Sequence, residues 1–194
     1  MGNLRVIGGE KRGFSLASPP GLDVRPTSAL VREALFDILA GEIPGACFLD
    51  LYAGTGAVGI EALSRGANLC VFVEQSRRGA RAIRGNLEAC GFGATGRVIA
   101  GHLPEVLLHT PAAEAFDIAF LDPPYGDPGV EGTLEALGGW EGLARDGRLV
   151  LEHRKSWEPP RRAGTLVLRR AARYGDTLLS FYDRREHPKA RRKV

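Results

Sequence analysis

A glycine-rich segment and an acidic residue downstream of it could together bind an adenosine-bearing ligand. The segment DLYAGTGAVG (50–59) satisfies the pattern G-x-G-x-x-G, with glycines at positions 54, 56 and 59. Glycines allow a ligand to approach the backbone closely. Glu74 follows Gly54 by twenty residues, where a carboxylate accepts hydrogen bonds from ribose hydroxyls. These residues suit either NAD or S-adenosylmethionine.

Three features of the chain favour S-adenosylmethionine over NAD. Asp50 precedes Gly54 by four residues, where a carboxylate can meet the cationic amino group of a methionine. The pattern does not require a pyrophosphate at the N-terminus of the following helix. With 194 residues, the chain also has no room for the separate substrate domain that dehydrogenases commonly carry.

A second motif, LDPPYG (121–126), ends a strongly apolar run. Its two prolines stiffen the turn and remove two N–H donors, which leaves backbone carbonyls and the Asp122 carboxylate as acceptors. Tyr125 adds a flat ring, so the segment suits a planar base that carries an exocyclic amine. The alternative is a purely structural proline turn capped by Asp122. A functional role is favoured, because this motif and the glycine segment are expected at the same edge of the sheet. We therefore predict four catalytic residues: Asp122, Pro123, Pro124 and Tyr125.

Alternating apolar runs and helical patterns predict the elements that position both motifs. Strands are expected at 47–54, 68–75, 96–101, 116–124 and 147–153. Helices are expected at 57–66, 76–91, 103–109, about 130–138, and 25–40, the last opening at Pro26-Thr27. Beyond residue 164 we expect an antiparallel hairpin that turns at 174–176, and over the first 20 residues a small hairpin or arm. This alternation implies an α/β fold with a mostly parallel sheet.

The basic residues gather at the two ends of the chain. The net charge is +3 over residues 1–32, −9 over 33–153 and +9 over 154–194, and 22 of the 26 basic residues are arginine. Basic ends suggest a nucleic acid partner, although a GC-rich genome also enriches arginine. The C-terminal run RREHPKARRKV (184–194) has two interpretations, a contact with RNA or a solvated end without a specific role.

Other classes of protein are disfavoured by what the sequence lacks. No apolar run approaches the roughly 20 residues that cross a bilayer, and the N-terminus lacks the apolar core of a secretory signal. The cysteines at positions 47, 70 and 90 form no C-x-x-C pair, which indicates buried thiols in a reducing compartment. We therefore expect a cytoplasmic protein with neither a disulfide scaffold nor a metal.

Taken together, the motifs resemble a known enzyme family. DLYAGTGAVG and FLDPPYG (120–126) are similar to class I S-adenosylmethionine-dependent methyltransferases that modify exocyclic amines. Three further segments resemble the RsmD family of 16S ribosomal RNA guanine-N2 methyltransferases: RVIGGEKRGFSL (5–16), GLDVRPTSALVREALFDIL (21–39) and RYGDTLLSFYDR (173–184). The resemblance covers nearly the whole chain, from about residue 4 to residue 184.

The resemblance implies a Rossmann-like class I methyltransferase fold. We expect a mostly parallel, seven-stranded sheet flanked by helices, with a small N-terminal β-hairpin or arm. The implied organisation is an RNA-contacting arm at 1–25, a methyltransferase domain at 26–185 and a basic tail at 186–194.

The resemblance also assigns roles to individual residues. The cofactor site would be formed by Asp50, Ala53, Gly54, Thr55, Gly56, Gly59, Glu74, Gln75, Gly101, His102 and Thr27. The target guanine would lie against the Asp122–Tyr125 turn, with Tyr125 stacked on it. RNA phosphates would contact Arg5, Lys11, Arg12, Arg25 and Arg32. Many relatives bind the adenine amine with an acidic residue after the third strand, whereas this chain has Gly101-His102, so a backbone group, His102 or water would have to replace it.

The implied reaction is direct displacement of a methyl group from S-adenosylmethionine by the guanine N2 nitrogen. Acceptors that bind the N–H groups favour a pyramidal, more nucleophilic nitrogen, and the proton passes to Asp122 or to water. The partner would be 16S ribosomal RNA in the small subunit, with the base in a loop or flipped out, and the protein a monomer. The alternatives are an adenine-N6 methyltransferase acting on DNA or RNA, an NAD-dependent oxidoreductase and a non-catalytic RNA-binding module.

Overall fold

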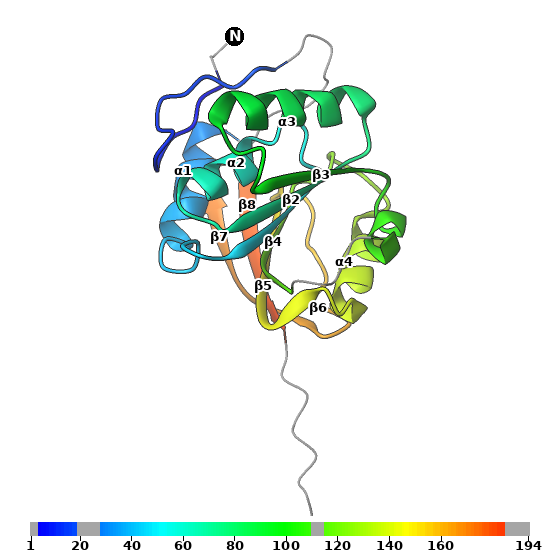
Figure 1. The fold of residues 1–194 in the computed structure, drawn as a ribbon. Helices are drawn as coiled ribbons and strands as arrows, with labels where there is room; N and C mark the ends of the chain where they lie inside the picture. Colours follow the sequence, from blue (N-terminus) through cyan, green and yellow to red (C-terminus); the bar gives the residue numbers. More distant parts are fainter. Residues whose placement is uncertain (1–3, 19–27, 110–114, 185–194) are drawn as a thin grey trace, which may run out of the picture.

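Eight strands form one sheet in the part of the chain that the computed structural model describes, residues 4–18, 28–109 and 115–184 (Figure 1). Their order is β3-β2-β1-β4-β5-β8-β7-β6. The strands are β1 Cys47–Leu51, β2 Leu69–Glu74, β3 Gly96–Ala100, β4 Phe116–Leu121, β5 Leu143–Arg154, β6 Arg162–Ala163, β7 Leu166–Tyr174 and β8 Thr177–Arg184. The helices are α1 Ala29–Ile38, α2 Ala57–Ser64, α3 Arg77–Cys90, α4 Val130–Gly139 and the 3-10 helix η1 Glu105–His109. The predicted α/β fold is confirmed.

The strands β3, β2, β1, β4 and β5 run parallel. Near-continuous apolar sequences predict this, because both faces of such strands are covered, and all six residues of β2 are buried. In the register of β1 with its two neighbours, Asp50 lies opposite Phe72 of β2 and opposite Phe120 of β4. The carboxyl ends of these three strands therefore meet at one edge of the sheet, where both sequence motifs lie.

Antiparallel strands complete the sheet. As predicted, β7 and β8 pair around the turn Gly175-Asp176, where Gly175 takes a φ of +64°. Strand β8 then pairs with β5. The expected number of seven strands is one too few, because the two-residue strand β6 pairs with Leu166 and Val167 of β7. A strand of two residues is too short to produce an alternation of apolar residues that the sequence could reveal.

Helices cover both faces of the sheet (Figure 1). On one face, α1, α2 and α3 contribute Leu35, Ile60 and Ile83 to a hydrophobic core. On the other face, η1 and α4 contribute Leu107 and Leu134 to a second core. The glycine segment and the Asp122 turn therefore emerge from a sheet that is held rigidly from both sides.

The ends of two helices follow from their capping residues. The Ser76 hydroxyl accepts a hydrogen bond from the Gly79 N–H at the start of α3, and the helix ends at Gly91 with a φ of +77°, as predicted. Helix α1 begins later than expected. Its N-cap is Ser28, whose hydroxyl accepts from the Val31 N–H, whereas Pro26-Thr27, the predicted opening, lies outside the described residues.

The described part of the N-terminal arm, residues 4–18, folds back on itself and packs against the domain. Arg5 and Ser15 form an antiparallel bridge, in agreement with the expected hairpin or arm. Val6 and Leu16 are buried in the core beneath α1, α2 and α3. In Figure 1 the arm lies beside these helices, so its position is fixed by their packing.

Cys70 and Cys90 are buried free thiols and Cys47 is half-buried, and burial raises the pKa of the Cys70 thiol well above its usual value.

Within the described ranges, no helix combines the length and the apolar character needed to cross a membrane.

Alanine substitution at two helix glycines should have opposite effects on stability, because Gly59 packs against β2 and Gly85 has no neighbour at its Cβ position. A Cβ at Gly59 would lie 2.3 Å from the Phe72 ring and 2.5 Å from the Cys70 sulfur. We expect Gly59→Ala to lower the free energy of unfolding by about 1–3 kcal/mol, because the core must shift. Gly85, in α3, has nothing within 4 Å of its Cβ position, so Gly85→Ala should raise that free energy by about 0.5–1 kcal/mol. Urea unfolding measures both, and equal effects would contradict the packing argument.

Candidate active site

The chain turns sharply between β1 and α2, at the glycine segment. Tyr52, Gly54 and Gly56 have positive φ angles of 59°, 57° and 78°. The Ala53 N–H donates to the Val73 carbonyl over 3.0 Å, and the Ala53 carbonyl accepts from the Gly56 N–H over 2.7 Å. Glycine adopts these angles without strain, but Tyr52 does not. Its strained backbone was not foreseen, because nothing in the sequence marks an aromatic residue that must take a positive φ.

The Glu74 carboxylate, at the end of β2, holds this turn in place. One carboxylate oxygen accepts from the Gly54 N–H over 2.8 Å and the other from the Ser76 N–H over 2.7 Å. A Cβ at Gly79 would lie 2.8 Å from the Glu74 Cγ, so α3 can approach only with glycine there. Each carboxylate oxygen has a second lone pair, which could accept a ribose hydroxyl. The geometry thus fits the predicted ribose contact.

The Asp50 carboxylate lies behind the glycine segment and is only 2% exposed. It accepts a hydrogen bond of 2.9 Å from the Gly59 N–H and so caps the first turn of α2 from the neighbouring strand. Burial raises the pKa of Asp50 well above its usual value, and the nearby carboxylates of Asp122 and Glu74 raise it further, against the opposing effect of the Gly59 bond. A cationic ligand group would favour the ionised form, which fits the methionine amino group predicted there.

The remaining predicted cofactor residues lie around the same edge. Gly101 follows β3 and donates its N–H to the Glu74 carbonyl over 3.2 Å, and a Cβ there would lie 2.6 Å from a Val106 methyl carbon. The side chains of Gln75 and His102 are exposed, whereas Thr55 is buried. Gln75 follows β2, and Gly101 and His102 follow β3, so they lie at the same end of the sheet as the glycine segment. Thr27 lies outside the described residues.

The turn that follows β4 presents the four predicted catalytic residues beside the glycine segment. The Asp122 N–H donates to the Leu51 carbonyl over 3.5 Å, which continues the pairing of β4 with β1. Pro123 is buried, and Tyr125 is 42% exposed. The guanidinium carbon of Arg154 lies 4.1 Å from the centre of the Tyr125 ring. A pocket of about 370 Å³ opens between this turn and the end of β5.

The basic residues predicted to contact RNA do not all lie on the surface. Arg5 and Arg12 are exposed on the arm and Lys11 is half-exposed, while Arg25 lies outside the described residues. The prediction for Arg32 is wrong, because its side chain is 2% exposed and cannot reach a phosphate. Its guanidinium donates to the Arg5 carbonyl, and burial lowers its pKa against the opposing effect of the Glu61 carboxylate. Arg32 therefore supports the arm from beneath.

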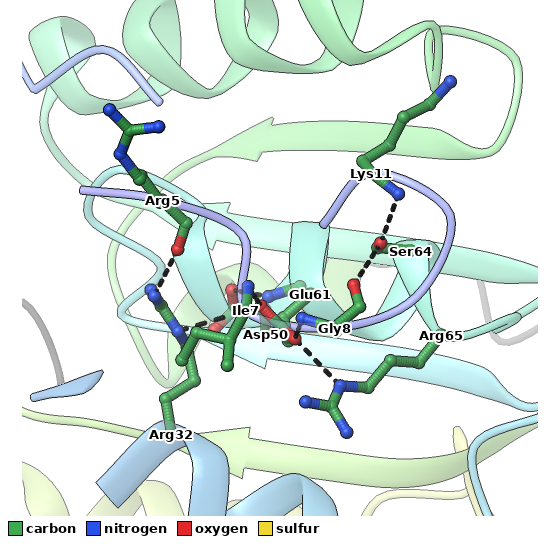
Figure 2. A network of polar contacts seen from close by, with 10 residues as sticks. Arg5, Ile7, Gly8, Lys11, Arg32, Asp50, Glu61, Ser64 and Arg65 are labelled. Carbon is green, nitrogen blue, oxygen red and sulfur yellow. Dashed lines mark hydrogen bonds and ion pairs between the residues drawn. The ribbon is translucent and has the colours of Figure 1, made fainter. Parts of the chain in front are cut away.

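A buried carboxylate that the sequence analysis did not select holds the arm in place. Figure 2 shows Glu61 of α2, which is fully buried, beneath the arm backbone. Its oxygens accept from the Ile7 and Gly8 N–H groups, each over 2.7 Å, and from the Arg65 Nε over 2.8 Å. The Arg32 Nε lies 3.9 Å away. The only signal in the sequence is an acidic residue within the apolar stretch of α2.

Asn86 of α3 joins the arm to the glycine segment. Its amide nitrogen donates to the carbonyls of Ala17 and Thr55, each over 3.1 Å, and its oxygen accepts from the Ala17 N–H over 2.8 Å. One side chain therefore bonds both to the arm and to the turn predicted to bind the cofactor. Sequence periodicity places Asn86 on α3 but does not identify these partners.

The Glu61 network predicts a large loss of stability when the carboxylate is removed. We expect Glu61→Gln to lower the free energy of unfolding by about 3–5 kcal/mol, because Arg32 stays buried without a counter-charge. Proteolysis within residues 4–18 should also accelerate. Glu88→Gln, at an exposed position of α3, is the matched control and should change stability by less than about 0.5 kcal/mol. Equal stabilities of the two variants would contradict an anchoring role for Glu61.

Comparison with known proteins adds the family. The sequence family described as "Conserved hypothetical protein 95" matches residues 4–183. The ribosomal RNA small subunit methyltransferase D of Escherichia coli is 36% identical over 153 residues, which is 78% of this chain and 75% of that protein. YlbH of Bacillus subtilis is 35% identical over 184 residues, 94% of this chain and 100% of YlbH. The solved structure of yhhF from E. coli has a TM-score of 0.83 at 30% identity and covers 96% of this chain and 100% of its own. The chain therefore belongs to the RsmD family of S-adenosylmethionine-dependent 16S ribosomal RNA methyltransferases.

Proposed function

We propose that the protein methylates the exocyclic N2 of a specific guanine in 16S ribosomal RNA. The observation that carries this proposal is the position of the Asp122–Tyr125 turn, which follows β4 at the carboxyl edge of the sheet, directly beside β1. Its hydrogen-bond acceptors therefore lie next to the glycine segment and Glu74. A base bound at the turn and a cofactor bound at the glycine segment would be neighbours.

The carboxylates of this edge suit the polar groups of S-adenosylmethionine. Glu74 would accept the ribose hydroxyls, and Asp50 would offer its charge to the methionine amino group. Gln75, Gly101 and His102 would flank the adenine. When bound, the cofactor supplies a methyl group already activated on a sulfonium, so the protein needs to position the reacting groups more than to supply an acid or base.

The Asp122 turn would bind the target base through its amino group. The Asp122 carboxylate and the Pro123 carbonyl accept hydrogen bonds and donate none, which matches the two N–H groups of guanine N2. These bonds favour a pyramidal nitrogen and stabilise the positive charge that develops on it. Tyr125 is exposed enough to stack on the base while Arg154 covers part of its ring. The guanine would lie in a loop or be flipped out of a helix.

The N-terminal arm would bring the RNA to this site. Arg5, Lys11 and Arg12 lie on an arm that Glu61 and Asn86 attach to the helices around the glycine segment. We assign residues 1–25 to RNA contact, 26–185 to methyl transfer and 186–194 to a basic tail. The partner would be 16S ribosomal RNA within the small subunit, and the protein would act as a monomer in the cytoplasm.

Methyl transfer with an Asp122 variant tests the proposed function. Labelled S-adenosylmethionine and small subunits that lack the modification should yield N2-methylguanosine at one 16S position, identified by mass spectrometry. Asp122→Ala should reduce the rate at least about 100-fold, because an acceptor for the amino group is lost, and leave cofactor affinity nearly unchanged. Asp37→Ala, at an exposed position of α1, is the control and should match the wild type. N6-methyladenosine as the product, or full activity of Asp122→Ala, would refute the proposal.

The raised pKa of Asp50 predicts how pH affects cofactor binding and stability. A carboxyl group whose pKa is raised by folding stabilises the fold below its unfolded pKa and loses that contribution as pH rises through the folded pKa. Without cofactor, Asp50→Asn should therefore become progressively more stable than the wild type as pH rises above about 4, the unfolded pKa of an aspartate, while the Asn oxygen still accepts from Gly59.

The same substitution should weaken S-adenosylmethionine binding at least about tenfold, because the charge opposite the amino group is lost. The affinity of the wild type should increase with pH as Asp50 ionises, and the affinity of Asp50→Asn should not. Thermal unfolding and calorimetric titration across this pH range measure both effects. Parallel pH profiles for the two proteins would contradict the role assigned to Asp50.

A further inference from the structure

Glu152, a buried acidic residue at the border of the pocket beside the Asp122 turn, has no role in the function proposed above. The pocket, of about 370 Å³, lies between residues 123–131 and the end of β5 with the residues that follow it. This volume is in the range of sites for small molecules. Glu152 lines the pocket although its side chain is only 4% exposed.

The sheet places Glu152 directly beside Asp122. In the register of β4 with β5, Leu121 lies opposite Leu151, and each is followed by an acidic residue: Asp122 directly after the end of β4, and Glu152 within β5. Phe120 and Val150, two residues earlier, are also opposite each other and belong to the same hydrophobic core. Side chains alternate along a strand, so Glu152 projects toward the same face as Val150, and Asp122, one residue beyond β4, continues the face of Phe120. Two carboxylates therefore border the place where the target base would bind.

The end of β5 is held so that Glu152 has a defined position. The next residue, His153, places its Nε2 2.8 Å from the Ser180 hydroxyl of β8 and its Nδ1 2.9 Å from the Arg154 carbonyl. The Trp157 ring meets the His153 ring edge-on, with 5.5 Å between the ring centres. Arg154, the last residue of β5, stacks on Tyr125 and so joins the two sides of the pocket.

Two neighbouring carboxylates discriminate between purines. Along its Watson–Crick edge, guanine presents N1–H beside the N2 amino group, which places donors next to each other. Adenine presents its amino group beside N1, which is an acceptor and would face a carboxylate oxygen unfavourably. A site with acceptors at both positions therefore selects guanine, whereas Asp122 and the Pro123 carbonyl alone would accept either amine.

On the basis of the proposed function, we propose that Glu152 is the residue that specifies guanine, by accepting a hydrogen bond from N1–H while Asp122 and the Pro123 carbonyl hold N2. The carboxylate contacts the base but not the methyl group, so it determines which base is bound in a reactive position. No covalent step involves Glu152.

A base analogue that keeps the amino group at position 2 but has neither the N1 proton nor the 6-oxygen tests this assignment, because a variant of Glu152 should change only the response to N1. 2-Aminopurine keeps the amino group at position 2 but has an unprotonated N1. Small subunits are reconstituted with 16S RNA that carries either guanine or 2-aminopurine at the target nucleotide, and kcat/KM is measured for each. The wild type should prefer guanine by at least about 100-fold, because a buried carboxylate would face the N1 lone pair of the analogue. A wild-type ratio near one would overturn the proposal.

Glu152→Gln should change this ratio in a way that a merely structural role would not. The amide can donate to the unprotonated N1 of 2-aminopurine, so the preference for guanine should fall at least about tenfold, through lower activity on guanine and higher activity on the analogue. Glu152→Asp, which keeps the charge, should retain the preference at reduced activity. Glu135→Gln, at an exposed position of α4, is the matched control and should behave as the wild type.

The outcomes separate the specificity of Glu152 from the function of the enzyme. N2-methylguanosine from the wild type supports the proposed function whatever the ratios are. An unchanged ratio in Glu152→Gln, with both substrates slowed equally, would overturn the assignment of Glu152 and leave the proposed function intact. N6-methyladenosine from the wild type would overturn both.

Discussion

The register of β1 between β2 and β4 is the constraint on which the site depends. It sets Asp50 opposite Phe72 and Phe120 and brings the ends of three strands to one edge. A shift of one residue would turn Asp50 to the other face of the sheet and remove the cap from α2. The apolar residues on both faces prevent such a shift, because they would have to leave two separate cores. Packing of the sheet therefore fixes the positions of the side chains at its edge.

Buried carboxylates are a second feature of the structure, and three of them accept hydrogen bonds from backbone amides. Glu74 accepts from Gly54 and Ser76, Asp50 accepts from Gly59, and Glu61 accepts from Ile7 and Gly8. Such bonds offset part of the cost of desolvating a charge. At Asp50 the offset is incomplete, as its raised pKa indicates. A ligand that brings a positive charge would offset the rest, so the burial of Asp50 would favour a bound cation such as the amino group proposed there.

Helices α2 and α3 connect the N-terminal arm to the predicted cofactor site. The arm that would contact RNA bonds to Glu61 on α2 and to Asn86 on α3. The same two helices pack beside the glycine segment, and Asn86 also bonds to Thr55 within it. The position of the arm is thus linked to the shape of the predicted cofactor site by direct contacts. An enzyme that must position two ligands, rather than supply an acid or base, gains from such rigidity.

The sequence alone determined the order of strands and helices, the location of the glycine segment and of the Asp122 turn, and the family. These features depend on apolar periodicity, glycines and short motifs, which are local in the chain. Only the tertiary structure showed that Arg32 is buried, that Glu61 anchors the arm and that Glu152 lies beside Asp122. These facts depend on contacts between residues far apart in the chain. A sequence pattern gives the type of a side chain, but burial and partners, which decide whether a charge binds a ligand or supports the fold, arise only when the elements pack.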